Sequence, residues 1–282
     1  MERHGIFMGI KCIALDMDRT TLNARGKLSD TNKKALQYAI DQGVHVVIAS
    51  GRSFSALPED VMAIKGIEYA ITCNGAEVYY IPEKKRMKSY CLSKQAVTAI
   101  MEITKSMPVT YEAFINGQAF AGVEYINDPV RFGATPQAVE YVRRTRTMIQ
   151  DIRLFIGEHS KELNSMDIIV RSPEMKDLVW KRLEEQVGDI YITSSIAQLI
   201  EISDKNAGKH SGLKFVAQHL NISHEEIAAF GDADNDVDML KAAGIGICVA
   251  NGSEKCLKAA DMVVGHHDTD GVAEGIYRIL KE

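Results

Sequence analysis

Residues 10–20 decide the fold of this chain, and they read IKCIALDMDRT. The short apolar run at residues 10–15 ends directly in acid, with carboxylates at Asp16 and Asp18. Continuous apolar strands are typical of parallel sheets that are covered on both faces. Because sites in open α/β sheets form beyond the carboxyl ends of the strands, this stretch predicts a buried strand with a functional site after it.

The first and last thirds of the chain alternate strands and helices in the same style. Three of the expected strands end in polar residues or glycine, at Asp16, at Ser50-Gly51 and at Gly231-Asp232. The alternation predicts an α/β fold with a doubly wound, mostly parallel sheet. The expected strands lie at residues 10–15, 44–49, 69–72, 227–230, 245–249 and 261–264, and the expected helices at 30–40, 54–64, 208–220 and 237–243.

The middle of the chain has a different texture, with four of the six prolines and the only tryptophan, Trp180. Helical patterns at residues 94–105, 136–150 and 173–186 mix with alternating, strand-like patterns at 111–121, 167–170 and 189–193. We therefore expect an inserted α+β domain at residues 83–199. Residues 1–82 and 200–282 would together form the parallel-sheet core.

Composition and charge argue against several classes of protein. The chain has 282 residues, of which 46% are apolar and 25% charged, so disorder, collagen and coiled coil are disfavoured. The net charge of −5 argues against a surface that binds nucleic acid over the whole protein. The longest apolar stretches span about half a dozen residues, whereas a membrane helix needs about 20. We expect neither a nucleic-acid nor a membrane partner.

The N-terminus and the cysteines favour a cytoplasmic protein. The apolar segment at residues 6–10 is too short for a signal peptide, and Met8 is an alternative start of the chain. The five cysteines are odd in number and form no C-x-x-C pair, which favours reduced thiols. We expect a monomer or a small homo-oligomer.

Residues 231–238 read GDADNDVD and place four carboxylates between a strand and a helix. One or two of them could cap the helix, but capping does not need four. An EF-hand loop is excluded, because Val237 stands where that loop needs glycine and Ala243 where it needs glutamate. A set of oxygen ligands without paired histidine or cysteine favours Mg²⁺ over zinc.

Two further segments are weaker signals when each is taken alone. Ser50 and Gly51 follow a strand and could offer a hydroxyl and backbone N–H groups to an anion, or they could cap a helix. Lys209 lies at the start of an expected helix, where a lysine is commonly a solvated surface residue.

Taken together and in order, these segments resemble the haloacid dehalogenase superfamily. The likeness is strongest to the Cof-like sugar-phosphate phosphatases with a type IIB cap. The motifs of that family are similar to residues 16–20 (DMDRT), 48–52 (IASGR), 201–213 with its lysine at Lys209, and 231–239 (GDADNDVDM). The family's turn after the third strand is similar to residues 74–76 (NGA).

The resemblance implies a Mg²⁺-dependent phosphatase for small phosphorylated metabolites, with sugar phosphates as the expected class. Asp16 would be the nucleophile that forms an aspartyl-phosphate, and Asp18 would be the general acid and base. The same resemblance implies that Asp16, Asp232 and the backbone carbonyl of Asp18 hold the Mg²⁺, with Asp236 as a further acid of the metal site. Closure of the inserted domain would exclude water and select the leaving group.

The phosphate group of the substrate would be held by a second set of residues that the resemblance identifies. These are Ser50, Gly51, Lys209 and Asn235. Two other functions stay open on the same residues. One is a phosphotransferase or phosphomutase, in which another hydroxyl intercepts the aspartyl-phosphate. The other is a non-catalytic protein that binds a phosphorylated metabolite.

Two features depart from the expected pattern or stand outside it. The family usually has glycine where this chain has Arg19, and glycine permits a positive φ that arginine adopts less freely. Arg19 could lower activity, add a phosphate contact or point to solvent. The basic run of Arg143, Arg144 and Arg146 could touch a second phosphate, although a solvated helix face is the simpler interpretation.

Overall fold

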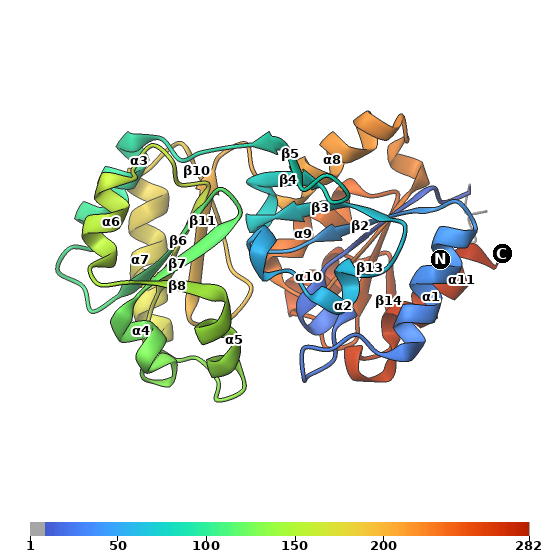
Figure 1. Ribbon diagram of the computed structural model, residues 1–282, viewed down its shortest axis with the longest axis horizontal. Helices are drawn as coiled ribbons and strands as arrows, with labels where there is room; N and C mark the ends of the chain where they lie inside the picture. The colour runs from blue at the N-terminus through green and yellow to red at the C-terminus, as the bar shows by residue number, and fades with distance from the viewer. Residues whose placement is uncertain (1–8, 282) are drawn as a thin grey trace.

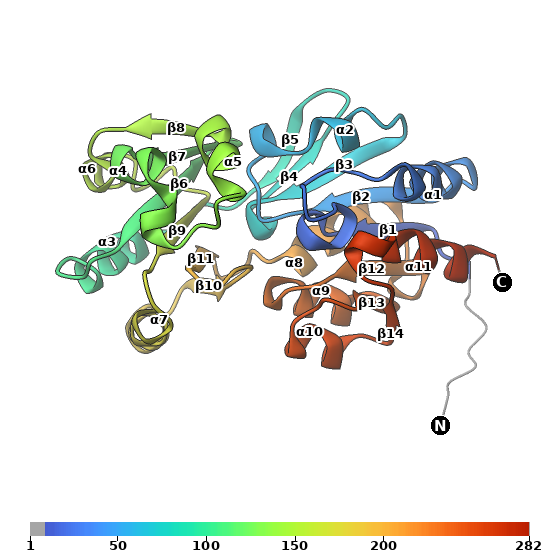
Figure 2. The ribbon, with the colours of Figure 1, turned by 90° about the horizontal axis from the view of Figure 1, so that it is seen from below.

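The computed structural model describes residues 9–281, which form two β-sheets with helices around them (Figure 1). The alternative start at Met8 lies outside the described residues. Within residues 9–281, no helix is both long enough and apolar enough to cross a membrane. The two sheets lie side by side along the longest axis of the molecule, as both ribbon views show (Figures 1 and 2).

The first sheet has eight strands in the order β14-β13-β12-β1-β2-β3-β4-β5. The strands from β14 to β3 are parallel, and β4 and β5 add an antiparallel hairpin at one edge. The chain winds outward from β1 in both directions, which confirms the doubly wound fold. The strands are β1 (Cys12–Leu15), β2 (His45–Ala49), β3 (Ile67–Thr72), β4 (Glu77–Tyr80), β5 (Lys85–Ser89), β12 (Ile227–Gly231), β13 (Ile245–Val249) and β14 (Met262–Val264).

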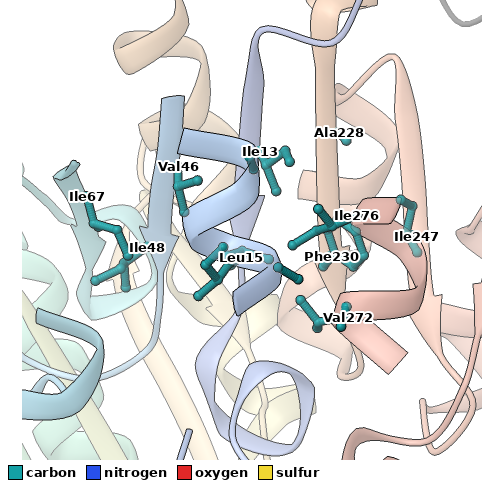
Figure 3. Packing of buried hydrophobic residues seen from close by; sticks show 14 of the residues in the cluster. Ile13, Leu15, Val46, Ile48, Ile67, Ala228, Phe230, Ile247, Val272 and Ile276 are labelled. Atoms are coloured by element: carbon teal, nitrogen blue, oxygen red, sulfur yellow. The ribbon is translucent and has the colours of Figure 1, made fainter. Parts of the chain in front are cut away.

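Helices cover both faces of this sheet, because successive residues of its strands point to opposite sides. Ile13 and Leu15 pack on the face of α1 and α11, with Phe230 and Ile276 (Figure 3). Cys12 and its alternate neighbours pack on the face of α8, α9 and α10. Each fully buried isoleucine or leucine contributes about 1.5–3 kcal/mol. The helices are α1 (Asp30–Asp41), α2 (Glu59–Met62), α8 (Lys209–Leu220), α9 (Val237–Ala242), α10 (Glu254–Ala259) and α11 (Gly271–Leu280).

Ser29 caps the start of α1, whereas the single helix expected at residues 54–64 is wrong. The Ser29 hydroxyl accepts a hydrogen bond from the backbone N–H of Asn32 at 3.0 Å. Residues 54–64 instead form a short turn, η2 (Phe54–Ala56), and then α2. Pro58 lies between them. Proline disfavours a helical residue before it and has no N–H to continue the helical bonding.

The second sheet has six strands in the order β10-β11-β9-β6-β7-β8, all antiparallel to their neighbours except β7 and β8. Helices α3, α6 and α7 lie on its far side from the first sheet (Figure 1). The strands are β6 (Thr110–Ile115), β7 (Gln118–Gly122), β8 (Arg146–Ile149), β9 (Ser165–Ile169), β10 (Ile190–Thr193) and β11 (Leu199–Asp204). The helices are α3 (Lys94–Ile103), α4 (Val123–Asn127), α5 (Ala138–Thr145), α6 (Ile152–Glu158) and α7 (Pro173–Gln186).

The helix expected at residues 136–150 stops early. Helix α5 ends at Thr145, and the next four residues form β8, which pairs with β7. Arg146 starts this strand with a buried side chain that pairs with Glu112 of β6. The interpretation of Arg146 as part of a solvated helix face is therefore wrong. Its partner lies 34 residues earlier in the sequence, so the local pattern gives no sign of the pairing.

The chain passes from the first sheet to the second after β5 and returns after β11. Strand β5 therefore belongs to the first sheet and β11 to the second, whereas the expected insert ran from residue 83 to residue 199. The two crossings lie side by side, because Tyr90 and Ala207 pack in one apolar cluster. The Tyr90 N–H also donates to the carbonyl of Ala76, and the Gly208 N–H to that of Asn74.

Candidate active site

Three buried carboxylates meet where β1 and β12 end. Asp16 follows β1 directly, Asp232 follows β12, and Asp236 ends the short turn η6 (Asp234–Asp236). The two strands are parallel neighbours, so their carboxyl ends meet at one edge of the sheet. Oxygens of the three carboxylates lie within 4.8 Å of one another. The strand-end rule therefore brings together the acids that the sequence analysis singled out.

Lys209 is the cation of this cluster. Its Nζ donates hydrogen bonds to Asp16 Oδ1 and to Asp236 Oδ1, each at 2.7 Å, and the side chain has no exposed surface. Burial alone would lower the pKa of Lys209, but Asp16 and Asp236 raise it above its usual value. The interpretation of Lys209 as a solvated surface lysine is excluded by this burial.

The cluster carries more negative charge than Lys209 balances. Burial and the charge of Asp236 raise the pKa of Asp16 well above its usual range, against the lowering effect of Lys209. Burial and the charge of Asp236 also raise the pKa of Asp232 to about 7. Three carboxylates around one ammonium group would bind a further cation favourably.

The free oxygens show where such a cation fits. Asp236 Oδ2 accepts hydrogen bonds from the backbone N–H groups of Asp232 and Ala233, both at 3.0 Å, so both of its oxygens are engaged. The hydroxyl of Thr20 donates to Asp232 Oδ1 at 3.1 Å. Asp16 Oδ2 and Asp232 Oδ2 have no hydrogen-bond donor within residues 9–281, although the Arg19 guanidinium lies 3.9 Å from the latter. The atoms that remain for a cation are carboxylate oxygens, the ligand type that Mg²⁺ takes.

Arg19 adopts a left-handed backbone conformation that glycine reaches without strain. Its φ is +61°, in the left-handed region that costs a residue with a side chain roughly 1–2 kcal/mol. The Arg19 carbonyl accepts a hydrogen bond from Asn251 Nδ2 at 2.8 Å, which holds the turn in place. The side chain is more than half exposed, with its Nε 3.9 Å from Asp232 Oδ2. It lines a cavity of about 270 Å³ together with Asp232, Lys176 and the segment 194–197.

Asp18 lies apart from the carboxylate cluster. Its two oxygens accept hydrogen bonds from Arg52, at 2.7 Å from Nε and 2.6 Å from the terminal nitrogen. The guanidinium of Arg52 also donates to the carbonyl of Ala56 and lies 4.6 Å from the ring centre of Tyr141 in α5. The local sequence gives no sign of this role of Arg52, because both its ring partner and its acid lie far away in the sequence.

Ser50 and Gly51 follow β2, the parallel neighbour of β1, so they lie at the same edge of the sheet as the carboxylate cluster. The next helical turn begins at Phe54, so Ser50 does not cap a helix. The Ser50 hydroxyl is buried and accepts a hydrogen bond from the Arg52 N–H at 3.2 Å. A Cβ atom at Gly51 would lie 3.0 Å from Glu201 Oε1, so the backbone here closely approaches the Glu201 side chain of β11.

A chain of amide hydrogen bonds links the site to the second sheet. Asn235 Nδ2 donates to Asn74 Oδ1 at 2.9 Å, and Asn74 Nδ2 donates to Glu201 Oε1 at 3.0 Å. Asn235 Oδ1 is buried and has no hydrogen-bond partner among residues 9–281. The sequence shows Asn74 as part of a turn motif that resembles the family's. It does not show that Glu201 is the partner of Asn74, because only the pairing of β11 brings Glu201 to this site.

Comparison with known proteins agrees with this site. Residues 13–276 match the family of haloacid dehalogenase-like hydrolases. The chain is 32% identical over 292 aligned residues to phosphatase YwpJ of Bacillus subtilis, covering 96% of this chain and all of that protein.

Solved structures share the fold over nearly the whole chain. A haloacid dehalogenase-like hydrolase from Bacillus subtilis superposes with a TM-score of 0.82 at 28% identity, covering 95% of this chain and 99% of that one. A sugar phosphatase of subclass IIB superposes with a TM-score of 0.79 at 20% identity, covering 95% and 98%. The second likeness shows the fold alone.

Proposed function

This chain belongs to the haloacid dehalogenase-like hydrolases and is a phosphatase, and we propose that it hydrolyses phosphate monoesters of small metabolites with Mg²⁺. Sugar phosphates are the proposed substrate class. One observation carries the proposal. Asp16 has one oxygen bound to the buried Lys209 and a second oxygen without a donor, next to Asp232. A carboxylate held in this way can attack phosphorus.

The proposed metal site uses the side chains of Asp16 and Asp232 and the backbone carbonyl of Asp18. Asp236 supports the site by holding Lys209 and the backbone of Asp232. When bound, Mg²⁺ would neutralise charge between the carboxylates and the phosphate dianion. This agrees with the excess of buried carboxylates over cations in the cluster.

The roles of the chain's own residues follow from their contacts. Asp16 would attack the phosphate and form the aspartyl-phosphate. Lys209, the Ser50 hydroxyl and the Gly51 N–H would hold the transferring oxygens, because Lys209 bonds Asp16 and the other two follow the parallel strand next to β1. Asn235 has one amide hydrogen bonded to Asn74, which leaves the second available for phosphate.

Asp18 would protonate the leaving group and then take a proton from water. Its carboxylate is paired with Arg52 in this structure, so proton transfer requires Asp18 to exchange Arg52 for the substrate. Arg52 also contacts Tyr141 of the second-sheet region. We propose that residues 90–207 form the cap, and that cap movement is coupled to this exchange.

A phosphate-release screen tests the proposed function. Purified protein is incubated with phosphorylated metabolites and with p-nitrophenyl phosphate, in Mg²⁺ and in EDTA. We expect Mg²⁺-dependent phosphate release that EDTA abolishes and added Mg²⁺ restores. Glu158→Gln serves as a matched control, because Glu158 is exposed in α6 on the outer helix layer. Turnover that is unchanged in EDTA would contradict the metal assignment.

A further inference from the structure

A row of three buried carboxylates crosses the second sheet. Glu112 of β6 lies directly opposite Asp167 of β9, and Asp167 lies directly opposite Glu201 of β11. Their exposed fractions are 1%, 5% and 4%. Directly opposed side chains have Cβ atoms about 4.5–5.5 Å apart, where like charges destabilise a sheet. Packing of the sheet alone does not require a row of buried acids.

The acidic row faces the active site. Side chains alternate along each strand, and the neighbours Tyr111, Ile168 and Ile202 pack on the apolar helix layer. The three acids therefore point away from that layer, toward the first sheet, and the ribbon view shows this sheet between the helices and the core (Figure 1).

Both ends of the row contact proposed catalytic segments. At one end, Glu201 Oε1 accepts from Asn74 at 3.0 Å and lies close above Gly51. At the other end, Glu112 forms two hydrogen bonds of 2.8 Å with Arg146. The Arg146 guanidinium lies 4.9 Å from the ring centre of Tyr141, the same ring that Arg52 contacts. Asp167 therefore lies between two acids that connect to the proposed catalytic segments. Glu201 approaches Gly51 directly, and Glu112 connects to Asp18 through Arg146, the Tyr141 ring and Arg52.

Asp167, at the centre, is unpartnered. Within residues 9–281 its carboxylate forms no hydrogen bond and no ion pair. Burial and the charges of Glu201 and Glu112 raise the pKa of Asp167 well above its usual range. Arg146 opposes these charges at one end of the row, and the half-buried Lys176 lies within electrostatic reach of Glu201 at the other end.

A second unpartnered group lies beside the row. Tyr125 of α4 is 4% exposed, and its hydroxyl has no hydrogen-bond partner among residues 9–281. Burial and the charges of Glu112 and Asp167 raise the pKa of Tyr125, which places its hydroxyl within electrostatic reach of both carboxylates. A buried hydroxyl and a buried carboxylate that share a region without bonding each other leave polar groups for a ligand to satisfy.

We propose that Glu112, Asp167 and Glu201, with Tyr125, form the subsite for the leaving group and select phosphate esters that carry an ammonium group. The inference rests on the proposed phosphatase function and adds the chemistry of the leaving group. An ammonium group donates up to three hydrogen bonds and would balance the carboxylate of Asp167, which neither Arg146 nor Lys176 pairs with. A second phosphate or a carboxylate on the leaving group would meet the unpaired carboxylate of Asp167, and repulsion would disfavour it.

The test compares matched alkyl phosphates that end in an amino, a hydroxyl or a carboxyl group, with chains of two to four carbons. We expect kcat/KM for the best amino ester to exceed that of the carboxyl ester by about tenfold or more, with the hydroxyl ester between them. The difference should lie mainly in KM, because the contact forms before the chemical step.

Asp167→Asn removes the carboxylate that can pair with an ammonium group, with little change of shape. We expect it to lower kcat/KM for the amino ester and to raise it for the carboxyl ester, so that their ratio falls by about tenfold. A structural defect would move both esters in the same direction. Glu158→Gln removes the same charge from the outer helix layer and should leave the ratio within about twofold, because salt screens distant charges.

The outcomes separate the inference from the function on which it rests. Mg²⁺-dependent hydrolysis of p-nitrophenyl phosphate by the unchanged protein tests the function alone, and its absence would overturn both. If p-nitrophenyl phosphate is hydrolysed but amino and carboxyl esters are used equally, the subsite is wrong. The same holds if Asp167→Asn changes both esters alike.

Discussion

Two groups of three buried carboxylates, each with one buried cation, face each other across this molecule. Asp16, Asp232 and Asp236 surround Lys209 at the strand ends of the first sheet. A second group, the acidic row of Glu112, Asp167 and Glu201, has Arg146 paired with Glu112 at one end, and the half-buried Lys176 within electrostatic reach of Glu201 at the other. In the first group Lys209 binds two of the carboxylates, whereas in the second group Arg146 binds only that of Glu112.

The two groups differ in which of their polar atoms lack a hydrogen-bond partner. In the first group, loop backbone N–H groups and the Thr20 hydroxyl also bind the acids, and the oxygens that remain point to one place. Such an arrangement suits a metal ion. In the second group, rigid strands hold the acids in a line and leave Asp167 alone. That arrangement suits an organic cation. The comparison teaches that charge balance alone does not define a site, and that the backbone carrying the acids decides what they bind.

The largest expected effect separates the two groups by catalysis. Asp16→Asn removes the proposed nucleophile and a metal ligand, so turnover of p-nitrophenyl phosphate should fall by about 10⁴-fold or more. Asp167→Asn should instead change the choice among substrates. Initial rates in Mg²⁺ measure both, and the melting temperature confirms that each variant is folded. Comparable activity of Asp16→Asn and the unchanged protein would remove the first group from the catalytic site.

Asp18→Asn should have the next largest effect, about 10²–10⁴-fold, because it removes only proton transfer. The loss should depend on the leaving group. An aryl phosphate needs little protonation, so its first step should suffer less than that of an alkyl phosphate. Rates for a series of aryl and alkyl phosphates measure this dependence. An equal loss on every substrate would assign Asp18 a role in phosphate or metal binding.

Replacing Lys209 or Arg146 compares the two groups by their effect on the free energy of unfolding. Lys209→Met leaves Asp16 and Asp236 buried without their partner, and Arg146→Met does the same to Glu112. Each change should lower the free energy of unfolding by about 3–5 kcal/mol. Mg²⁺ should restore part of the loss only in Lys209→Met, because a cation fits that group. Urea unfolding in EDTA and in Mg²⁺ measures both, and equal rescue would mean that the two groups bind metal alike.

The smallest effect concerns pH. The pKa of Asp232 rises from 3.8 to about 7 on folding without metal, so the folded state holds a proton that the unfolded state has lost in that range. In EDTA, stability should therefore fall as the pH rises from about 4 to about 7. Asp232→Asn should flatten this slope, and melting temperatures over that range measure it. In Mg²⁺ the slope should also flatten, since the metal holds the ionised form. An unchanged slope in Asp232→Asn would show that its environment does not shift its titration.

The sequence predicts the first group far better than the second. Residues 16–20 and 231–238 lie next to strands whose apolar runs are continuous, so strand-end geometry places their acids together. The second group comes from residues 112, 167 and 201 on three separate strands, and only the pairing of β6, β9 and β11 aligns them. Single acids in alternating segments look like solvated faces. The ion pair of Arg146 is hidden from the sequence for the same reason, because long-range strand pairing brings Glu112 to it.

The most direct test of the central claim is to trap the phosphorylated enzyme. Asp18→Asn is mixed with p-nitrophenyl phosphate and Mg²⁺, quenched in acid within a single turnover, and mapped by mass spectrometry. The account predicts that phosphate accumulates on Asp16, because the first step proceeds while the water that should release it lacks its base. Asp16→Asn should show none. Phosphate on another residue, or no phosphoenzyme although product forms, would contradict the assignment of Asp16 as the nucleophile.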